Sequence, residues 1–366
     1  MLNKNNVISG NNFSAFADVV FSERVSKKIY PEVKKGNFYK VIERVENDFS
    51  SDVWFINKKI ILNKNSTIFC KTEALELLFL IIKDVPKEYE LNLISHQSDI
   101  SIDQKLFNKK PECIKEWYAV NVVYKHKNLH HIPLGISEEF RKKHLNVDYL
   151  DEMLKPNNFE INNSIYINYN QNTNEKIRSK IFKKLKNASF INIGSYGSEI
   201  NEYIKDLKCN KYILCPTGNG LDTYRLWESL IVGSYPVVNS VENYLEFRNL
   251  PIHFFDDASK LNIEFLDSNS DLIEKLQNEN QDKEYLFAEY WVKNIKKEKE
   301  NNNEVEEMVI IIDENLEKSY FRKFFIIKTF KSNLKVVRFY IYQYLNIFNY
   351  FRFILRKFDL IDDKSF

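Results

Sequence analysis

Short apolar runs alternate with helical patterns along most of this chain of 366 residues. Runs such as "DVWFI" and "KYILCP" have the length of buried strands, whereas "TEALELLFLIIKDV" repeats its apolar residues at helical spacing. Strands that alternate with helices form βαβ units and pack into a parallel sheet. The alternation therefore predicts an α/β fold.

The alternation falls into two series, which are separated by a polar, Pro-containing stretch at residues 151–163. A chain of this length can bury two cores of ordinary size. We expect one domain over residues 1–155 and a second domain over residues 156–295. The remaining region, residues 296–366, contains a charge run and a basic tail.

Composition and cysteine usage narrow the class of protein. The chain is 44% hydrophobic and 28% charged, as soluble globular proteins are, and its formal net charge of +2 argues against a nucleic-acid-binding protein. The N-terminus has no apolar core of secretory type, and no apolar run is long enough for an ordinary transmembrane helix, so we expect a cytoplasmic protein. The cysteines have no metal-ligand spacing, which favours buried free thiols over disulfides or zinc; they are Cys70, Cys113, Cys209 and Cys215.

A glycine-containing loop, "CPTGNG", lies between a predicted strand and a predicted helix. In open parallel sheets such a loop lies at the carboxyl end of a strand, where ligands bind. Glycines let the backbone approach a ligand closely, and the amides of a helix start favour an anion. The loop lacks the GK[ST] of a P-loop, and Thr223 replaces the third glycine of a dinucleotide fingerprint. By itself it predicts either a phosphate site or a structural turn.

The helix that follows carries charged residues on one face. Asp222, Arg225 and Glu228 recur at three-residue spacing. An Arg there can grip a diphosphate through its planar fork, and a Glu one turn later can accept hydrogen bonds from ribose hydroxyls. The alternative is an ion pair on a solvated helix face. A second face, expected to be core, is formed by Tyr224, Trp227, Leu230 and Ile231.

The segment "LCPTGNGLDTYRLWESLIVGSYPVV" resembles the signature of exostosin-type glycosyltransferases, with a Pro-x-Gly-Asn-Gly-x-Asp loop, an Arg, Trp-Glu-x-Leu and Gly-x-x-Pro-Val-Val. Upstream, "LISHQSDISID" and "WYAVNVVYKHKNLHHIPLGI" are similar to bacterial members of that group. "INYNQNTNEKIRSKIF" matches the family's polar loop with a Thr and a downstream Arg. The resemblance covers roughly residues 90–260. It departs at Thr217, where the family is expected to have an Arg.

The resemblance implies a GT-B fold, in which two Rossmann-like domains face a cleft. The N-terminal domain would hold the acceptor and the C-terminal domain the nucleotide-sugar. Glu228 would bind the ribose, and Arg225 with the loop amides would bind the diphosphate. The chain has no Asp-x-Asp triplet, which agrees with a metal-independent enzyme that needs no cofactor and neutralises the leaving diphosphate with cations and helix ends. The expected donor-binding residues are Thr173, Arg178, Thr217, Gly218, Asn219, Gly220, Asp222, Arg225 and Glu228.

A general base for the acceptor hydroxyl is expected at the end of a predicted strand in the first domain. "SHQSD" places His96 and Asp99 there, and Asp99 is the first choice because a carboxyl is ionised at neutral pH. The alternative for Asp99 is a capping role in a turn. Three further histidines, at positions 126, 130 and 131, have no carboxylate or cysteine near them in sequence and are expected at the surface.

The tail at residues 318–358 contains ten Lys or Arg and no Asp or Glu, interleaved with aromatic residues. Such a segment suits the face of an anionic membrane. The alternative is a pair of helices that pack on the domains or on a second subunit in a homodimer. We therefore expect peripheral contact with the inner face of the cytoplasmic membrane.

The leading functional hypothesis is a glycosyltransferase that moves a sugar from a nucleotide-sugar donor to a glycan or lipid-linked glycan. Its products would be surface polysaccharide, capsule or lipopolysaccharide, and the transfer would invert the configuration of the anomeric carbon. One alternative is a sugar-nucleotide epimerase of GT-B-like fold. Another is a noncatalytic nucleotide- or glycan-binding protein.

Overall fold

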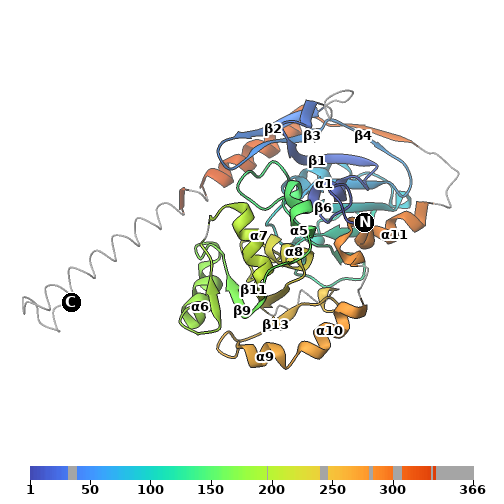
Figure 1. Ribbon diagram of the computed structural model, residues 1–366. Coiled ribbons are helices and arrows are strands. Elements are labelled where there is room, and N and C mark those ends of the chain that lie inside the picture. Colours follow the sequence, from blue (N-terminus) through green and yellow to red (C-terminus); the bar gives the residue numbers. More distant parts are fainter. Residues whose placement is uncertain are drawn as a thin grey trace, which may run out of the picture. The chain divides into compact units, whose positions relative to one another are not determined.

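The structure is a computed structural model that describes residues 1–31, 39–195, 197–239, 246–279, 283–299, 307–330 and 333–334. The chain divides into two compact units, Met1–Ile311 and Ile312–Phe366. The first unit contains both large sheets (Figure 1). Below, its residues 1–155 are called the first half and its residues 156–295 the second half.

A seven-stranded sheet with the order β2-β3-β1-β5-β6-β7-β8 forms the first half. Five of its strands run parallel, and β3 and β2 continue the sheet antiparallel from the edge of β1. The predicted parallel sheet is confirmed, with an added antiparallel edge. The strands are β1 (Val19–Ser26), β2 (Tyr39–Glu46), β3 (Ser51–Asn57), β5 (Thr67–Lys71), β6 (Leu91–His96), β7 (Ile114–Ala119) and β8 (Leu129–His131).

The central strands of this sheet are buried on both faces. Every residue of β5 and of β6 is buried, including polar residues such as Asn92, Ser95 and His96. Both faces of these strands are therefore covered, as is usual in parallel sheets. Among the described residues of this half, the α-helices are short: α1 (Gly10–Ser14), α3 (Leu75–Ile81), α4 (Gln104–Phe107) and α5 (Leu150–Leu154). Most of its residues therefore lie in strands and loops.

A five-stranded parallel sheet forms the second half, in the order β10-β9-β11-β12-β13. The chain starts at β9, moves outward to β10, and then returns past β9 to β11, so the winding direction reverses between β9 and β11. Ligands of doubly wound sheets bind at the carboxyl ends of such strands. The elements are β9 (Asn162–Ile167), α6 (Glu175–Leu185), β10 (Ile191–Ile193), α7 (Ile200–Cys209), β11 (Asn210–Leu214), α8 (Tyr224–Val232), β12 (Tyr235–Asn239), β13 (His253–Phe255), α9 (Ile263–Asp267) and α10 (Ser270–Glu279).

One buried apolar cluster joins the two halves. Ile94 and Leu134 of the first half and Ile213 and Trp227 of the second half belong to it. Each predicted domain thus contributes one sheet, while the shared cluster helps to make residues 1–311 a single compact unit. The division at residue 155 stays a prediction.

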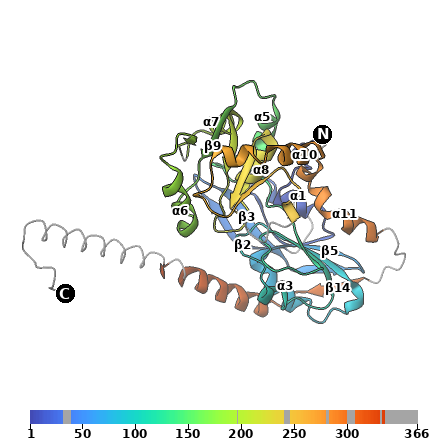
Figure 2. The ribbon, with the colours of Figure 1, turned by 90° about the horizontal axis from the view of Figure 1, so that it is seen from below.

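The end of the second half returns to the N-terminus. The amide of Ile8 donates to Leu286 O at 2.9 Å, and the amide of Ala288 donates to Asn6 O at 2.9 Å. This contact places α11 (Ala288–Lys299) beside α1 (Figure 1; Figure 2). Further along, β14 (Met308–Ile311) pairs antiparallel with β4 (Lys59–Leu62).

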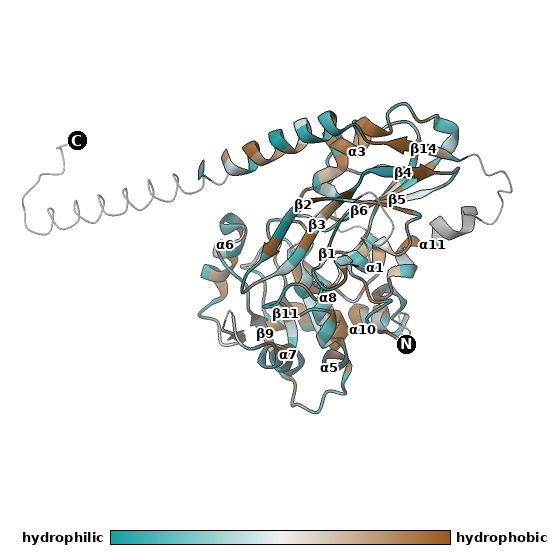
Figure 3. Cartoon of the chain, turned by 90° about the horizontal axis from the view of Figure 1, so that it is seen from above, coloured by the Kyte–Doolittle hydropathy of each residue, from teal (hydrophilic) through white to brown (hydrophobic). Residues whose placement is uncertain are grey.

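The second unit contains a helix at residues 314–330. Hydrophilic and hydrophobic residues alternate along it (Figure 3), and Ile326 and Phe330 are exposed. Most of the predicted basic tail lies outside the described residues. Within the described part of the chain, no helix combines the length and apolarity needed to cross a bilayer.

All four cysteines are free thiols, as predicted; Cys70, Cys113 and Cys215 are buried and Cys209 is half-buried. The expectation of three surface histidines is wrong for His131, which is 2% exposed. His130 also has a carboxylate partner, because the pairing of β8 with β7 brings Glu116 Oε2 to 2.7 Å from its Nε2. Residues that meet across paired strands can be far apart in the sequence, so this partner of His130 could not be predicted from its neighbours in the chain.

Candidate functional site

A pocket of about 380 Å³ opens where the winding of the second sheet reverses. It is called the switch-point pocket below. The loops that follow β9 and β11 form one wall, and Phe49, Asp99, Lys143 and His144 of the first half contribute to the other. Eight of the nine expected donor-binding residues line it: Thr173, Arg178, Gly218, Asn219, Gly220, Asp222, Arg225 and Glu228.

Glu228 and Arg225 are the charged side chains of α8 in this pocket. Glu228 is 5% exposed, and Tyr203 donates its hydroxyl to Glu228 Oε2 at 2.8 Å. Burial raises the pKa of Glu228 to about 7, against the opposing effects of Arg225 and Tyr203. The Nε of Arg225 is buried without a hydrogen-bond partner. Buried polar groups are normally satisfied, so this donor is one that a ligand in the pocket could use.

The start of α8 provides a second unsatisfied group. Thr223 is the N-cap residue, but its side chain makes no capping hydrogen bond, and its Oγ1 is buried without a partner. The N-terminus of a nine-residue helix, the Thr223 hydroxyl and Arg225 therefore face one pocket. Together they favour an anionic ligand.

The prediction that Asp222 shares a helix face with Arg225 and Glu228 is wrong, because α8 begins only at Tyr224. The Asp222 carboxylate instead accepts hydrogen bonds from Leu134 N at 2.7 Å, Trp227 Nε1 at 2.8 Å and Thr223 N at 2.6 Å. Burial raises its pKa to about 6, and these three donors oppose that shift. Asp222 therefore fixes the start of α8 to the first half.

The glycines of the loop make room for protein side chains. A Cβ on Gly220 would lie 2.9 Å from Asn121 Oδ1, and a Cβ on Gly218 would lie 2.9 Å from Arg178 Nη2. The amide of Gly218 donates to Gly220 O at 3.1 Å, so one of the expected anion-binding amides is already used inside the loop. Close packing explains these two glycines without a ligand.

Arg178 holds the two pocket loops together. It is 7% exposed, and its guanidinium donates to the carbonyls of Thr217 at 3.1 Å, Pro216 at 3.1 Å and Asn170 at 3.2 Å. The guanidinium thus positions the two loops, and the positive charge that Arg178 is expected to add at the donor site stays a prediction. Thr217 does not line the pocket, because its amide donates to Asn239 Oδ1 at 2.9 Å at the end of β12.

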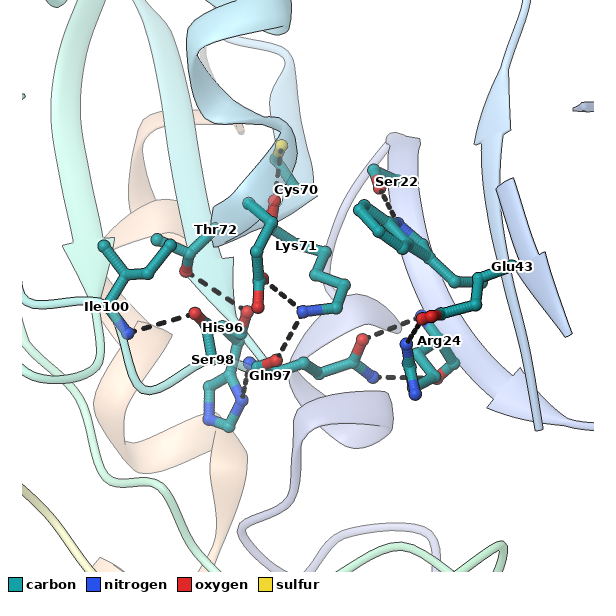
Figure 4. Close-up of polar contacts among 12 residues, drawn as sticks. Ser22, Arg24, Glu43, Cys70, Lys71, Thr72, His96, Gln97, Ser98 and Ile100 are labelled. Atoms are coloured by element: carbon teal, nitrogen blue, oxygen red, sulfur yellow. Dashed lines mark hydrogen bonds and ion pairs between the residues drawn. The ribbon is translucent and has the colours of Figure 1, made fainter. Parts of the chain in front are cut away.

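His96 is committed to the first sheet and is a poor candidate for a base. The amide of Gln97 donates to His96 Nδ1 at 2.8 Å (Figure 4). The proton is therefore on Nε2, which donates to Pro133 O at 3.0 Å. Burial lowers its pKa to about 4. Asp99, in contrast, is exposed at the pocket wall and is available to a substrate.

Two residues of the site give no signal in the sequence. Tyr203 reaches Glu228 from α7, and Asn121 links the halves by donating to Ser98 O at 2.8 Å and accepting from Asp222 N at 3.0 Å. Asn121 has φ +56°, a conformation in which Asn is enriched.

The described residues contain no group of three or more His, Cys, Asp or Glu side chains placed to hold a metal ion. In comparisons with known proteins, no family model matches this chain. No curated protein matches its sequence significantly either.

Proposed function

We propose that this protein is a glycosyltransferase of GT-B architecture that transfers a sugar from a nucleotide-sugar to a glycan or lipid-linked glycan acceptor. The observation that carries the proposal is that Glu228 and Arg225, whose Nε is buried without a hydrogen-bond partner, both line the switch-point pocket. The residues of the exostosin-like signature include Gly218, Arg225 and Glu228, which line this pocket. On this proposal residues 156–295 bind the donor and residues 1–155 bind the acceptor, in surface-polysaccharide synthesis.

The donor would lie across the start of α8. Glu228 accepts hydrogen bonds from the ribose hydroxyls, while Arg225, Thr223 and the helix N-terminus hold the diphosphate. These groups stabilise the charge that develops on the leaving diphosphate, which agrees with a reaction that needs no metal ion.

Asp99 would act on the acceptor from the opposite wall. Its carboxylate takes the proton of the acceptor hydroxyl as that oxygen attacks the anomeric carbon. A new glycosidic C–O bond forms, the bond from the anomeric carbon to the diphosphate breaks, and the nucleoside diphosphate leaves with the bonding electrons. Attack from the face opposite the leaving group inverts the anomeric centre.

The proposal is tested by a thermal-shift screen of UDP-, GDP-, CMP- and TDP-sugars, because a ligand that binds only the native state raises the melting temperature. One of these donors should stabilise the wild type, and Glu228→Ala should weaken that binding without unfolding the protein. Transfer to a glycan extract in the presence of EDTA would support the metal-free reaction. Release of a free epimerised sugar would indicate an epimerase, and binding without turnover a noncatalytic protein.

We also propose that the basic C-terminal segment contacts an anionic membrane. In the described part of this segment, exposed Ile326 and Phe330 accompany Lys323 and Lys328 on one helix. The full chain should sediment with anionic liposomes and dissociate partly at high salt. Salt-independent behaviour, or a dimer that dissociates on removal of residues 312–366, would favour packing on protein instead.

A further inference from the structure

A second cavity, of about 250 Å³, adjoins the switch-point pocket and shares Asp99, Leu134 and Tyr224 with it. It lies at the carboxyl ends of β5 and β6, where Figure 4 shows Lys71, Gln97 and Arg24. Three cations, Arg24, Lys71 and Arg141, line this cavity, which is called the cationic pocket below.

Two of these cations are engaged by the protein itself. Lys71 is 4% exposed, forms an ion pair with Glu73, and donates to Gln97 O at 2.9 Å. Arg24 forms ion pairs with Glu43 at 2.5 Å and Asp52 at 3.0 Å. Their contacts hold β1, β5 and the loop after β6 in place.

Arg141 is the exception among the three. No side chain in the described part of the chain forms a hydrogen bond or an ion pair with its guanidinium, which lies 5.7 Å from the ring centroid of Tyr224. Arg141 is only partly exposed. A half-buried guanidinium without a hydrogen-bond partner has its donors available to a ligand, and a carboxylate or phosphate is the partner that its planar fork fits best.

The carboxyl groups of the pocket do not satisfy Arg141. Glu73 pairs with Lys71, and Glu138 accepts a hydrogen bond from Asn11 N at 2.8 Å. Burial raises the pKa of Glu138 to about 8, so this group is largely protonated and uncharged near neutral pH. Lys71 is thus balanced by Glu73, and Arg24 by Glu43 and Asp52, whereas Arg141 has no ion-paired carboxylate among the described residues. Asp99, which lines the same pocket, acts on the Arg141 guanidinium only through its charge.

We propose that the cationic pocket binds an anionic group of the acceptor, a carboxylate or a phosphate, and that Arg141 is the residue that binds it. This inference rests on the proposed transferase function and specifies its acceptor class as an acidic or phosphorylated sugar. The two pockets meet at Asp99 and Tyr224. An acceptor anchored at Arg141 therefore presents a neighbouring hydroxyl to Asp99 and to a donor bound against α8.

Titration calorimetry or ligand-observed NMR with glucuronate, glucose 6-phosphate and neutral glucose tests the proposal. The wild type should bind at least one anionic sugar roughly tenfold or more tightly than glucose, the size of effect expected for a charge-assisted hydrogen bond. Arg141→Gln should remove that preference while retaining the wild-type melting temperature. Preference for glucuronate identifies a carboxylate site, and preference for glucose 6-phosphate a phosphate site.

Two control variants separate this site from its surroundings. Lys142→Gln removes one positive charge at the next residue, which is exposed and lines neither pocket, and should keep the preference. Arg225→Gln should weaken binding of nucleoside diphosphates but keep binding of the anionic sugar. Equal affinity for charged and neutral sugars in the wild type, or an unchanged preference in Arg141→Gln, overturns the inference. Failure of every nucleotide-sugar to bind, with the Arg141-dependent preference intact, would overturn the transferase proposal alone.

Discussion

Glu228 shows how burial can tune one carboxyl group for binding. Its pKa of about 7 means that the side chain is largely protonated below neutral pH and ionised above it. The ionised form accepts stronger hydrogen bonds and has no proton that occupies one oxygen, and Tyr203 already donates to one of the two oxygens. The affinity for a ribose is therefore expected to depend on pH.

We predict that a nucleotide-sugar binds more tightly as the pH rises from 6 to 8. Binding favours the ionised carboxylate, so below a pKa of about 7 the dissociation constant should increase by up to about tenfold per pH unit. Isothermal titration calorimetry at several pH values measures this dissociation constant. Glu228→Gln cannot ionise and should show weaker binding with a flat pH dependence; a parallel slope in this variant would assign the titration to another group.

A second prediction distinguishes the roles of Asp99 and His96. Asp99→Asn should leave donor affinity unchanged and lower turnover by about 10²–10⁴-fold, because the amide cannot take the acceptor proton. His96→Gln should act mainly on stability, since both ring nitrogens hold backbone groups near the pocket. Steady-state kinetics beside thermal unfolding distinguishes the two, and near-normal turnover of Asp99→Asn would remove Asp99 from the mechanism.

The sequence predicts which residues belong to the candidate site but not which residues they contact. Arg225 and Glu228 are found because they lie on one helix within a local motif. The role of Asp222 cannot be found in the same way, since it depends on Leu134, 88 positions away. Asn121 and Tyr203 are equally remote from the motif, so their contacts become visible only in the folded chain.

Elements are predicted better than partners because periodicity is a local property. The strand and the helix that are predicted on either side of the glycine loop both appear, as β11 and α8. Periodicity cannot predict the pairing of β14 with β4, because the two strands are far apart in the sequence. The same holds for α11, whose position beside α1 follows from contacts between residues 6–8 and 286–288.

The loop before α8 offers a test of why it contains glycine. Gly220→Ala should destabilise the ligand-free protein by about 1–3 kcal/mol, as overpacking does, because the new methyl group meets the Asn121 amide. In an Asn121→Gly background the same change should cost much less, since Gly removes that amide and tolerates φ +56°. Denaturant unfolding of the four proteins gives the coupling free energy.

A different result would restore the ligand-based explanation of this glycine. If Gly220→Ala has wild-type stability but binds the donor poorly, the loop is glycine-rich for the approach of a ligand. If it is equally destabilising in both backgrounds, the strain lies elsewhere in the loop.

The first unit contains buried carboxyl groups, such as Glu23 and Glu138, whose raised pKa values make folding less favourable at high pH. Glu23 on β1 is 6% exposed, and Ser14 Oγ donates to its Oε1 at 2.6 Å. Burial raises its pKa to about 8, from an ordinary value of 4.5. Between these two values the folded state keeps a proton that the unfolded state has released. The contribution of Glu23 to the free energy of unfolding is therefore greatest below pH 4.5 and is lost as the pH rises to about 8.

We predict that Glu23→Gln becomes more stable relative to the wild type as the pH is raised from 5 to 8. Gln has no proton to lose and can still accept the Ser14 hydrogen bond. The difference in unfolding free energy should grow by up to about 1.4 kcal/mol per pH unit and level off above the folded-state pKa. Urea unfolding at fixed pH values measures it. Glu138, whose pKa is also raised to about 8, is present in both proteins, so its own titration largely cancels in the difference. A stability difference that stays constant across this range would mean that Glu23 is ionised in the folded protein, and the buried pair of Glu23 and Ser14 would then need a cation or water that compensates the charge.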